Sequence, residues 1–229
     1  MRQTSRRYRA AIETQGYDRH KRYPLMEALH VLESFPTPKF DETVELCVRL
    51  GIDPKKSDQM VRGSVSLPKG IGKTRSVAVF AEGEAAEAAE AAGADIVGSQ
   101  DLAKRIQEGF SEFDVCIAHP SMMRHVGKLG RILGPQGKMP SPKSGTVTEN
   151  IADAVSEFKA GKVEFRADMG GNVHVPVGKR SFAAEDLASN ITHFLDHLKT
   201  MKPAAVKGTY VRKVSVSATM SPGITVDLS

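Results

Sequence analysis

Alternation of apolar and polar residues marks two stretches of the chain as strands with one buried face. Val44, Leu46, Val48 and Leu50 recur at every second position, which is the side-chain period of a β-strand. Residues 209–220, TYVRKVSVSATM, alternate in the same way. Both stretches therefore predict half-buried strands that pack one face against a core.

Helical periodicity and a further pair of strands complete the pattern near the ends of the chain. Residues 24–35 begin with proline and place leucines on one side of a helix, and residues 182–202 predict a longer amphipathic helix that ends before a proline. Residues 162–168 and 172–178 alternate on either side of Met169-Gly170-Gly171. This last arrangement predicts a β-hairpin.

The middle of the chain has a different texture. Strands and helices alternate there. The predicted strands, which are apolar throughout, are residues 75–83, 95–98 and 113–120, and the predicted helices are residues 84–95 and 100–109. Ser99 is the expected N-cap of the second helix. Residues 120–145 start helical and then become a loop rich in glycine, proline and lysine, and residues 148–161 return to helix. This rhythm predicts a mainly parallel sheet between layers of helices.

The change of texture predicts an α/β protein of two domains. Residues 1–67 and 160–229 form a discontinuous α+β domain with an antiparallel sheet, and residues 68–159 form an inserted, Rossmann-like α/β domain of three layers. We expect the two crossings, near Pro68 and Gly161, to lie side by side and to act as a hinge.

Charge and cysteine content narrow the class of protein. The net charge is +5, and bases without acids gather in residues 120–145 and 199–213, while residues 82–101 carry acids without bases. Basic faces favour a polyanionic partner. Cys47 and Cys116 lie in apolar runs and are expected to be buried free thiols in a reducing compartment, the cytoplasm. No apolar run is long enough for a membrane span, and the N-terminus lacks the apolar core of a secretory signal.

Gly72-Lys73-Thr74 resembles the end of a phosphate-binding loop, which raises the alternative of an α/β nucleotide-binding NTPase. That loop needs a first glycine where Leu67 stands and a helix after the threonine, whereas a strand is predicted after Thr74. A tight turn into that strand is therefore the preferred interpretation. We expect no catalytic residues, because no nucleophile, base and carboxylate are placed by spacing.

Two further candidates concern metals and phosphates. His193 and His197 lie one helical turn apart, but no third ligand is evident, so neither a metal nor another cofactor is expected. The basic loop carries Arg131, Lys138 and Lys143. Exposed backbone and lysines there suit contact with phosphates, and a plain solvated surface loop is an equally open interpretation.

The ends of the two alternating strands carry side chains that could form one patch. Lys39, Phe40 and Thr43 stand at the start of one strand, and Thr219 and Met220 at the end of the other. If the two strands are neighbours, these five residues bring a cation, two hydroxyls and apolar surface together in one patch. That combination suits the shallow minor groove of folded RNA.

Five segments together resemble one family in order along nearly the whole chain, from about Arg7 to Pro222. They are KFDETVELCVRLGIDPKKSDQMVRGSVSLPKGIGKT, KLGRILGPQGKMPSPKSGTV, GKVEFRAD, VHVPVGK and KGTYVRKVSVSATMSP. The chain resembles the bacterial large-subunit ribosomal protein L1 family, the stalk protein. The resemblance implies a split α+β domain with an inserted α/β domain, which agrees with the fold predicted from the pattern.

The resemblance also implies a function. It implies a non-enzymatic constituent of the large ribosomal subunit, otherwise a monomer, that binds 23S rRNA and forms the mobile stalk near the tRNA exit site. There it assists the release of deacylated tRNA. Members also repress translation by binding the mRNA of their own operon, at a site that mimics the rRNA site.

By the same resemblance, the rRNA-binding residues lie mainly in the split domain. They are Lys39, Phe40, Asp41, Glu42, Thr43, Arg166, Thr219, Met220 and Ser221. The family usually has glycine after Thr-Met, so Ser221 adds a side chain where the backbone is expected to approach RNA. The resemblance implies secondary contacts to rRNA or tRNA from Arg131, Lys138 and Lys143.

Overall fold

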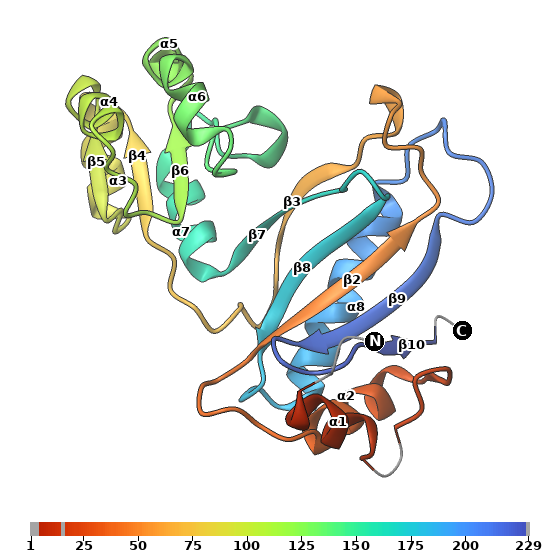
Figure 1. Cartoon of the computed structure of the whole chain (residues 1–229). Helices are drawn as coiled ribbons and strands as arrows, with labels where there is room; N and C mark the ends of the chain where they lie inside the picture. Colours follow the sequence, from red (N-terminus) through yellow and green to blue (C-terminus); the bar gives the residue numbers. More distant parts are fainter. Residues whose placement is uncertain (1–4, 15–16, 228–229) are drawn as a thin grey trace. The chain divides into compact units, whose positions relative to one another are not determined.

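The computed structural model describes residues 5–14 and 17–227 and divides them into two compact units (Figure 1). The split unit comprises the described residues up to Gly72 together with those from Phe165 onward, and the inserted unit is Lys73–Glu164. Each boundary lies a few residues beyond the expected crossings, 67/68 and 159/160. The protein is therefore an α/β protein whose segments before and after the insert fold together.

The split unit is built on a five-stranded sheet with the order β1-β10-β9-β2-β8. The strands are β1 (Arg22–Tyr23), β10 (Ile224–Val226), β9 (Val211–Ala218), β2 (Thr43–Leu50) and β8 (Asn172–Lys179). The pairs from β10 to β8 are antiparallel, as predicted, whereas β1 joins the edge in parallel. The two strongly alternating segments, β2 and β9, are thus direct neighbours.

One face of this sheet forms the core of the split unit. Val44, Leu46, Val48 and Leu50 are all buried, which confirms the predicted alternation. The helices α2 (Leu25–Ser34) and α8 (Ala184–Thr200) cover this face (Figure 1). Their apolar sides bury Leu29, Leu32, Leu187, Ile191, Phe194 and Leu198 against the sheet, where each large aliphatic side chain contributes about 1.5–3 kcal/mol.

The opposite face of the sheet is outward and polar, which corrects the expectation that both cysteines are buried. Cys47 stands at an outward position of β2 and is half-exposed, because its parity on the strand is opposite to that of the buried residues. Its neighbour across the sheet is His174, with 3.9 Å between the sulfur and the ring Nε2. Cys116 is buried in the inserted unit, and burial raises the pKa of its thiol to about 12.

The predicted hairpin around Met169 is wrong in its pairing. Strand β7 (Lys162–Arg166) pairs with β3 (Arg62–Ser66) in a separate two-stranded sheet, while β8 pairs with β2. A single bridge between Ala167 and Val173 joins the two segments. The turn itself exists, closed by the Asp168 carboxylate, which accepts from the backbone N–H groups of Gly170 and Asn172.

Several short elements have too little periodicity to be seen in the sequence. Helix α1 (Arg6–Ile12), the two-residue strand β1 and the three-residue strand β10 are among them. Tertiary pairing, rather than local pattern, defines such elements. Strand β10, near the C-terminus, pairs with β9 and extends the sheet on that side.

The inserted unit is a three-layer α/β structure, as predicted. Its parallel sheet has the order β5-β4-β6, from β4 (Val77–Phe80), β5 (Ile96–Gly98) and β6 (Val115–Ala118). The helices are α3 (Glu84–Ala91), α4 (Gln100–Gln107) and α7 (Ile151–Ala160). Val77 and Val79 pack with α3 and α7, and Ala78 and Phe80 pack with α4 on the other face. Ser99 precedes α4, but its side chain makes no capping bond.

The basic loop is more regular than predicted. Short helical turns run from residue 120 to residue 133 as η2 (Pro120–Met122), α5 (Met123–Val126), η3 (Gly127–Leu129) and α6 (Gly130–Leu133). Gly127 and Gly130 have helical backbone angles there, because the buried Val126, Leu129 and Leu133 tie the turns to the core. A further turn, η4 (Pro142–Ser144), ends at a glycine. Within the described residues, no helix is long and apolar enough to cross a membrane.

Candidate nucleic-acid interface

The start of β2 and the end of β9 meet at one edge of the split unit. Their register pairs Val44 with Ala218. Beyond that pair, the Thr219 N–H donates to the Thr43 carbonyl oxygen at 3.1 Å, and the Thr43 N–H donates to the Thr219 hydroxyl at 3.2 Å. Two segments that are 176 residues apart are therefore held side by side, which is the arrangement that the predicted patch requires.

A buried carboxylate fixes the next residue of each segment. Glu42 is 1% exposed, and its Oε1 accepts from the Met220 N–H at 2.8 Å. Its Oε2 forms an ion pair with Arg180. The Glu42 side chain therefore points into the protein, and its role in this arrangement is to hold the backbone of Met220.

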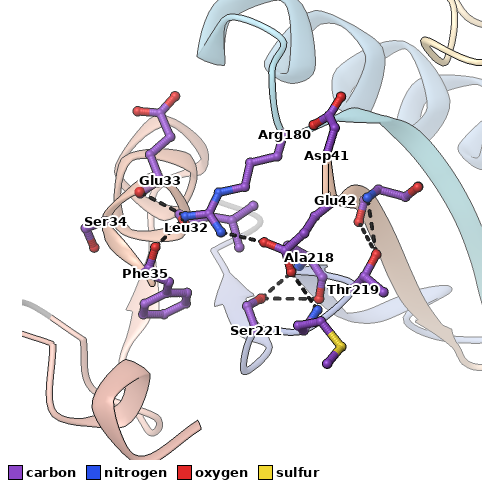
Figure 2. A network of polar contacts seen from close by, with 12 residues as sticks. Leu32, Glu33, Ser34, Phe35, Asp41, Glu42, Arg180, Ala218, Thr219 and Ser221 are labelled. Atoms are coloured by element: carbon purple, nitrogen blue, oxygen red, sulfur yellow. Dashed lines mark hydrogen bonds and ion pairs between the residues drawn. The ribbon is translucent and has the colours of Figure 1, made fainter. Parts of the chain in front are cut away.

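Arg180 follows β8 and ties this carboxylate to the end of α2. Figure 2 shows its guanidinium between Glu42 and the last turn of that helix. One of its nitrogens donates to the carbonyl oxygens of Leu32, Glu33 and Phe35 at 3.1, 3.0 and 2.6 Å. The Leu32 carbonyl also accepts from the Phe35 N–H at 3.4 Å. The guanidinium therefore supplies partners chiefly to the carbonyls of Glu33 and Phe35, and it also balances the buried charge of Glu42.

The side chains around this framework face solvent. Phe40 is 52% exposed and Met220 is 44% exposed. Lys39 and Thr219 are also exposed, and Thr43 is half-buried. We call these five residues the platform. A platform with an aromatic ring, a thioether, hydroxyls and one cation can make close apolar and hydrogen-bonded contact with a shallow groove.

Two neighbouring side chains are held by bonds within the protein. The Asp41 carboxylate accepts from the Ser181 N–H at 3.2 Å and from its hydroxyl at 2.8 Å. Lys179 donates from its ammonium nitrogen to the Thr43 hydroxyl at 2.9 Å. Asp41 thus fixes the chain between Phe40 and Thr43 of the platform, and Lys179 brings a second cation to the platform's edge.

Ser221 closes the turn that presents Met220. Its N–H donates to the Ala218 carbonyl oxygen at 3.1 Å, and its hydroxyl accepts from the Ala218 N–H at 2.8 Å. Glycine could make the first bond but not the second. The side chain that departs from the family pattern is therefore used to stabilise the turn.

Hollows flank the platform on two sides. One, of about 590 Å³, is lined by Phe40, Asp41, Arg180 and neighbouring residues. The other, of about 480 Å³, is lined by Thr219, Met220, Ser221 and residues Ser5, Arg7 and Tyr8 of the N-terminal segment. Sequence reasoning missed Arg180, Lys179, Arg7 and Tyr8 as neighbours of the platform. Arg6, Arg7 and Arg9 lie close together in the sequence, and this cluster is the signal that could have drawn attention to Arg7.

The structure does not bring the remaining predicted residues to the platform. Arg166 is exposed on β7, and the adjacent Ala167 bridges Val173, which pairs with Val48 rather than with the start of β2. Arg131 and Lys143 are exposed in the inserted unit. Lys138 is half-buried there, with its ammonium donating to the Ser111 carbonyl oxygen at 3.0 Å.

The Gly-Lys-Thr triplet forms a turn and not a nucleotide site. Gly72 has φ +68°, and a Cβ there would lie 2.8 Å from the Lys179 Cγ. Lys73 pairs with Asp114 at 3.1 Å. Burial acts to raise the pKa of Asp114, but the Lys73 ion pair outweighs it and holds that pKa below its usual value. The chain then enters β4, so the helix that would hold a phosphate is absent from this position.

The two histidines of α8 have different surroundings, and His193 is exposed. His197 lies edge-on to the Phe165 ring, with 6.2 Å between centroids, and burial lowers the pKa of its imidazole. Among the residues that the structure describes, no cluster of histidine, cysteine and carboxylate groups is arranged to hold a metal ion.

Comparison with known proteins agrees with the resemblance seen in the sequence. The model of the Ribosomal protein L1p/L10e family matches residues 32–222, which is most of the chain. The chain belongs to this family. The match includes every platform residue, the buried pair Glu42 and Arg180, and the whole inserted unit.

Individual members of the family are similar over nearly their whole length. Large ribosomal subunit protein uL1 of Kosmotoga olearia is 54% identical over 210 residues, which cover 92% of this chain and 91% of the relative. The proteins of the same name from Bordetella pertussis and Bordetella parapertussis are each 53% identical over 221 residues, or 96% of this chain and 95% of the relative. Membership of the L1p/L10e family confirms the family that the sequence predicted. It also confirms the prediction that the protein is a ribosomal protein rather than an enzyme.

Proposed function

We propose that the protein is a cytoplasmic constituent of the large ribosomal subunit and binds 23S rRNA through the platform of the split unit. The similarity to relatives named large ribosomal subunit protein uL1 supports membership of the large subunit. The proposal for the RNA site rests on one observation. Hydrogen bonds hold the start of β2 beside the end of β9, where Phe40 and Met220 are exposed.

The chemistry of the platform favours folded RNA over a small molecule. Its surface presents few charges, so affinity comes from shape, apolar contact and hydrogen bonds to 2′-hydroxyls. Cations around it, Lys39 and Lys179, supply attraction to phosphates that weakens as salt rises. Glu42 is buried, so it positions the backbone without presenting its carboxylate to the RNA. The carboxylate of the exposed Asp41 is engaged by Ser181.

We further propose the finer roles that the family resemblance implies. The protein forms the mobile stalk near the tRNA exit site, and the exposed Arg131 and Lys143 of the inserted unit contact rRNA or deacylated tRNA as it leaves. The same platform binds the mRNA of the protein's own operon. A transcript of the operon leader should therefore compete with 23S rRNA, and platform variants should lose both ligands in parallel.

The substitution Met220→Asp tests the platform. A carboxylate at this position would be buried without a partner against RNA, so we expect binding of a 23S rRNA transcript to weaken by about 2 kcal/mol or more, which is roughly thirtyfold. Filter binding at fixed salt measures this. Met60→Asp is the matched control, because Met60 is 45% exposed but lies outside the platform.

The two variants separate the platform from a general effect of negative charge. Met60→Asp should bind within about twofold of the natural protein. If Met220→Asp binds 23S rRNA as tightly as Met60→Asp does, the platform has no part in recognition. Binding of the natural protein no tighter than to an unrelated RNA of equal length would contradict the proposed function as a whole.

A further inference from the structure

The hollow between α1 and the turn after β9 extends the platform toward the N-terminus. Ser5, Arg7 and Tyr8 line one wall, and Thr219, Met220 and Ser221 line the other. The hollow has a volume of about 480 Å³ and is wide open to solvent, so a group that is part of a larger ligand can enter it. The hollow shares Thr219 and Met220 with the platform, so a ligand bound to the platform lies next to the hollow.

The charge of this hollow selects an anionic occupant. No carboxylate lines it, and α1 has the sequence RRYRAAI without an acid. Within the described part of the chain, the Arg7 guanidinium forms no salt bridge with a carboxylate. A guanidinium presents a planar set of donors that matches two oxygens of a phosphate.

The remaining walls offer a stacking surface rather than further charge. Tyr8 is half-buried, and this aromatic residue lines the hollow together with Met220. The Ser5 hydroxyl accepts from the Tyr8 N–H at 3.2 Å, and the Thr219 hydroxyl is bonded to the Thr43 backbone. The polar groups of the walls are thus largely engaged, which leaves the Arg7 guanidinium and the Tyr8 side chain to meet a ligand.

We propose that the hollow binds a single unpaired nucleotide of the RNA on the platform, with its phosphate against Arg7 and its base stacked on Tyr8. The inference rests on the proposed function, because the platform has to bring the RNA to the hollow. A base enters a concave site only when it is turned out of a helical stack. Stacking on aromatic side chains is the usual way in which proteins hold such bases.

Substitutions on α1 test the site in the full chain with a 23S rRNA transcript. Arg7→Ala should weaken binding about tenfold and should reduce the slope of log K against log salt by about 1. Arg6→Ala is the matched control: it removes the same charge from the same helix but does not line the hollow. It should change affinity less than twofold.

Tyr8 distinguishes stacking from hydrogen bonding. Tyr8→Ala should weaken binding by about tenfold, while Tyr8→Phe should bind nearly as the natural protein does. Chemical probing of the bound transcript should show one nucleotide that is protected with the natural protein and with Tyr8→Phe but reactive with Tyr8→Ala. Arg7→Ala and Tyr8→Phe keep the test valid if Tyr8→Ala disturbs the packing of α1.

Two results would overturn the inference without touching the proposed function. Equal losses for Arg7→Ala and Arg6→Ala would mean general attraction by charge, and unchanged protection in Tyr8→Ala would mean that no base stacks there. In both cases Met220→Asp would still lose binding. If the natural protein itself does not bind 23S rRNA specifically, the proposed function fails, and the inference fails with it.

Discussion

Arg180 sets the position of two chain segments at once. Its guanidinium donates to three carbonyl oxygens at the end of α2 and forms an ion pair with Glu42. Glu42 in turn accepts from the Met220 backbone. A surface made of exposed side chains is therefore held by a charged pair beneath it, because buried polar groups require partners in fixed directions.

Replacing Arg180 by methionine should expose this dependence. The change leaves the Glu42 carboxylate buried without a counter-charge and removes the donor for the three helix carbonyls, so we expect the split unit to lose about 3 kcal/mol of stability. Hydrogen exchange of the amides of β2 and β9 measures the change. The Met220 amide should lose protection first.

A paired substitution separates stability from organisation. Glu42→Leu combined with Arg180→Met removes both charges, and an apolar pair of similar volume often restores stability. The Met220 N–H would still lack its acceptor, so RNA affinity should stay low while the free energy of unfolding recovers. Recovery of both quantities together would show that the ion pair has no positioning role.

At the scale of elements, the turn into β4 shows what a sequence motif cannot tell. Gly72 is required by its positive φ and by its contact with Lys179 and Phe182, while the neighbouring Lys73 is an exposed partner of Asp114. A phosphate-binding loop would need the lysine most. A turn needs the glycine most. A Cβ there would collide with neighbouring side chains, and a positive φ is unfavourable for any residue with a side chain.

In this turn, Gly72→Ala should therefore have a larger effect than Lys73→Ala. At a nucleotide site, the lysine variant would have the larger effect. We expect Gly72→Ala to destabilise the protein by about 1–3 kcal/mol, and Lys73→Ala by less than about 1 kcal/mol, since the ion pair is exposed. Thermal unfolding followed by circular dichroism would compare them. A larger effect from Lys73→Ala, together with saturable binding of labelled ATP, would favour the rival NTPase.

Elements that bury a periodic face could be predicted from the sequence, and their partners could not. The alternation of β2 and β9 is visible because each second side chain enters the core. The segments that became β7 and β8 alternate just as clearly, yet each pairs with a strand far away in the chain. Alternation records which face is buried, but it carries no information on which edge accepts the strand.

The candidate site divides in the same way. Phe40 and Met220 could be proposed from local sequence because each follows or precedes a clear strand. The resemblance implied that Glu42 binds RNA, and nothing in the local sequence singled out Arg180. Only the topology places the two together beneath the surface. Arg7 and Tyr8 belong to a seven-residue helix, which is too short to show a reliable period.

At the scale of the whole molecule, each unit has its own core. The split unit buries one face of its sheet beneath α2 and α8, and the inserted unit buries both faces of a separate parallel sheet. Such units are expected to fold independently. The chain therefore offers a direct test of which unit recognises RNA.

We expect the split unit to fold and bind 23S rRNA without the insert. Residues 73–161 are replaced by a short Gly/Ser linker, which keeps Lys162–Arg166 so that β7 can still pair with β3. Affinity should stay within about tenfold of the full chain, because the platform is intact. Circular dichroism checks the fold, and loss of specific binding in a folded product would place recognition in the insert.

The salt dependence of the two proteins then decides what the basic loop contacts. Each phosphate neutralised by a cation contributes about 0.9 to the slope of log K against log salt. Lys138 is committed to the Ser111 carbonyl oxygen, so Arg131 and Lys143 are the predicted contacts. Removing the insert should make the slope shallower by about 2. An unchanged slope would mean that these cations do not touch 23S rRNA and remain available for tRNA.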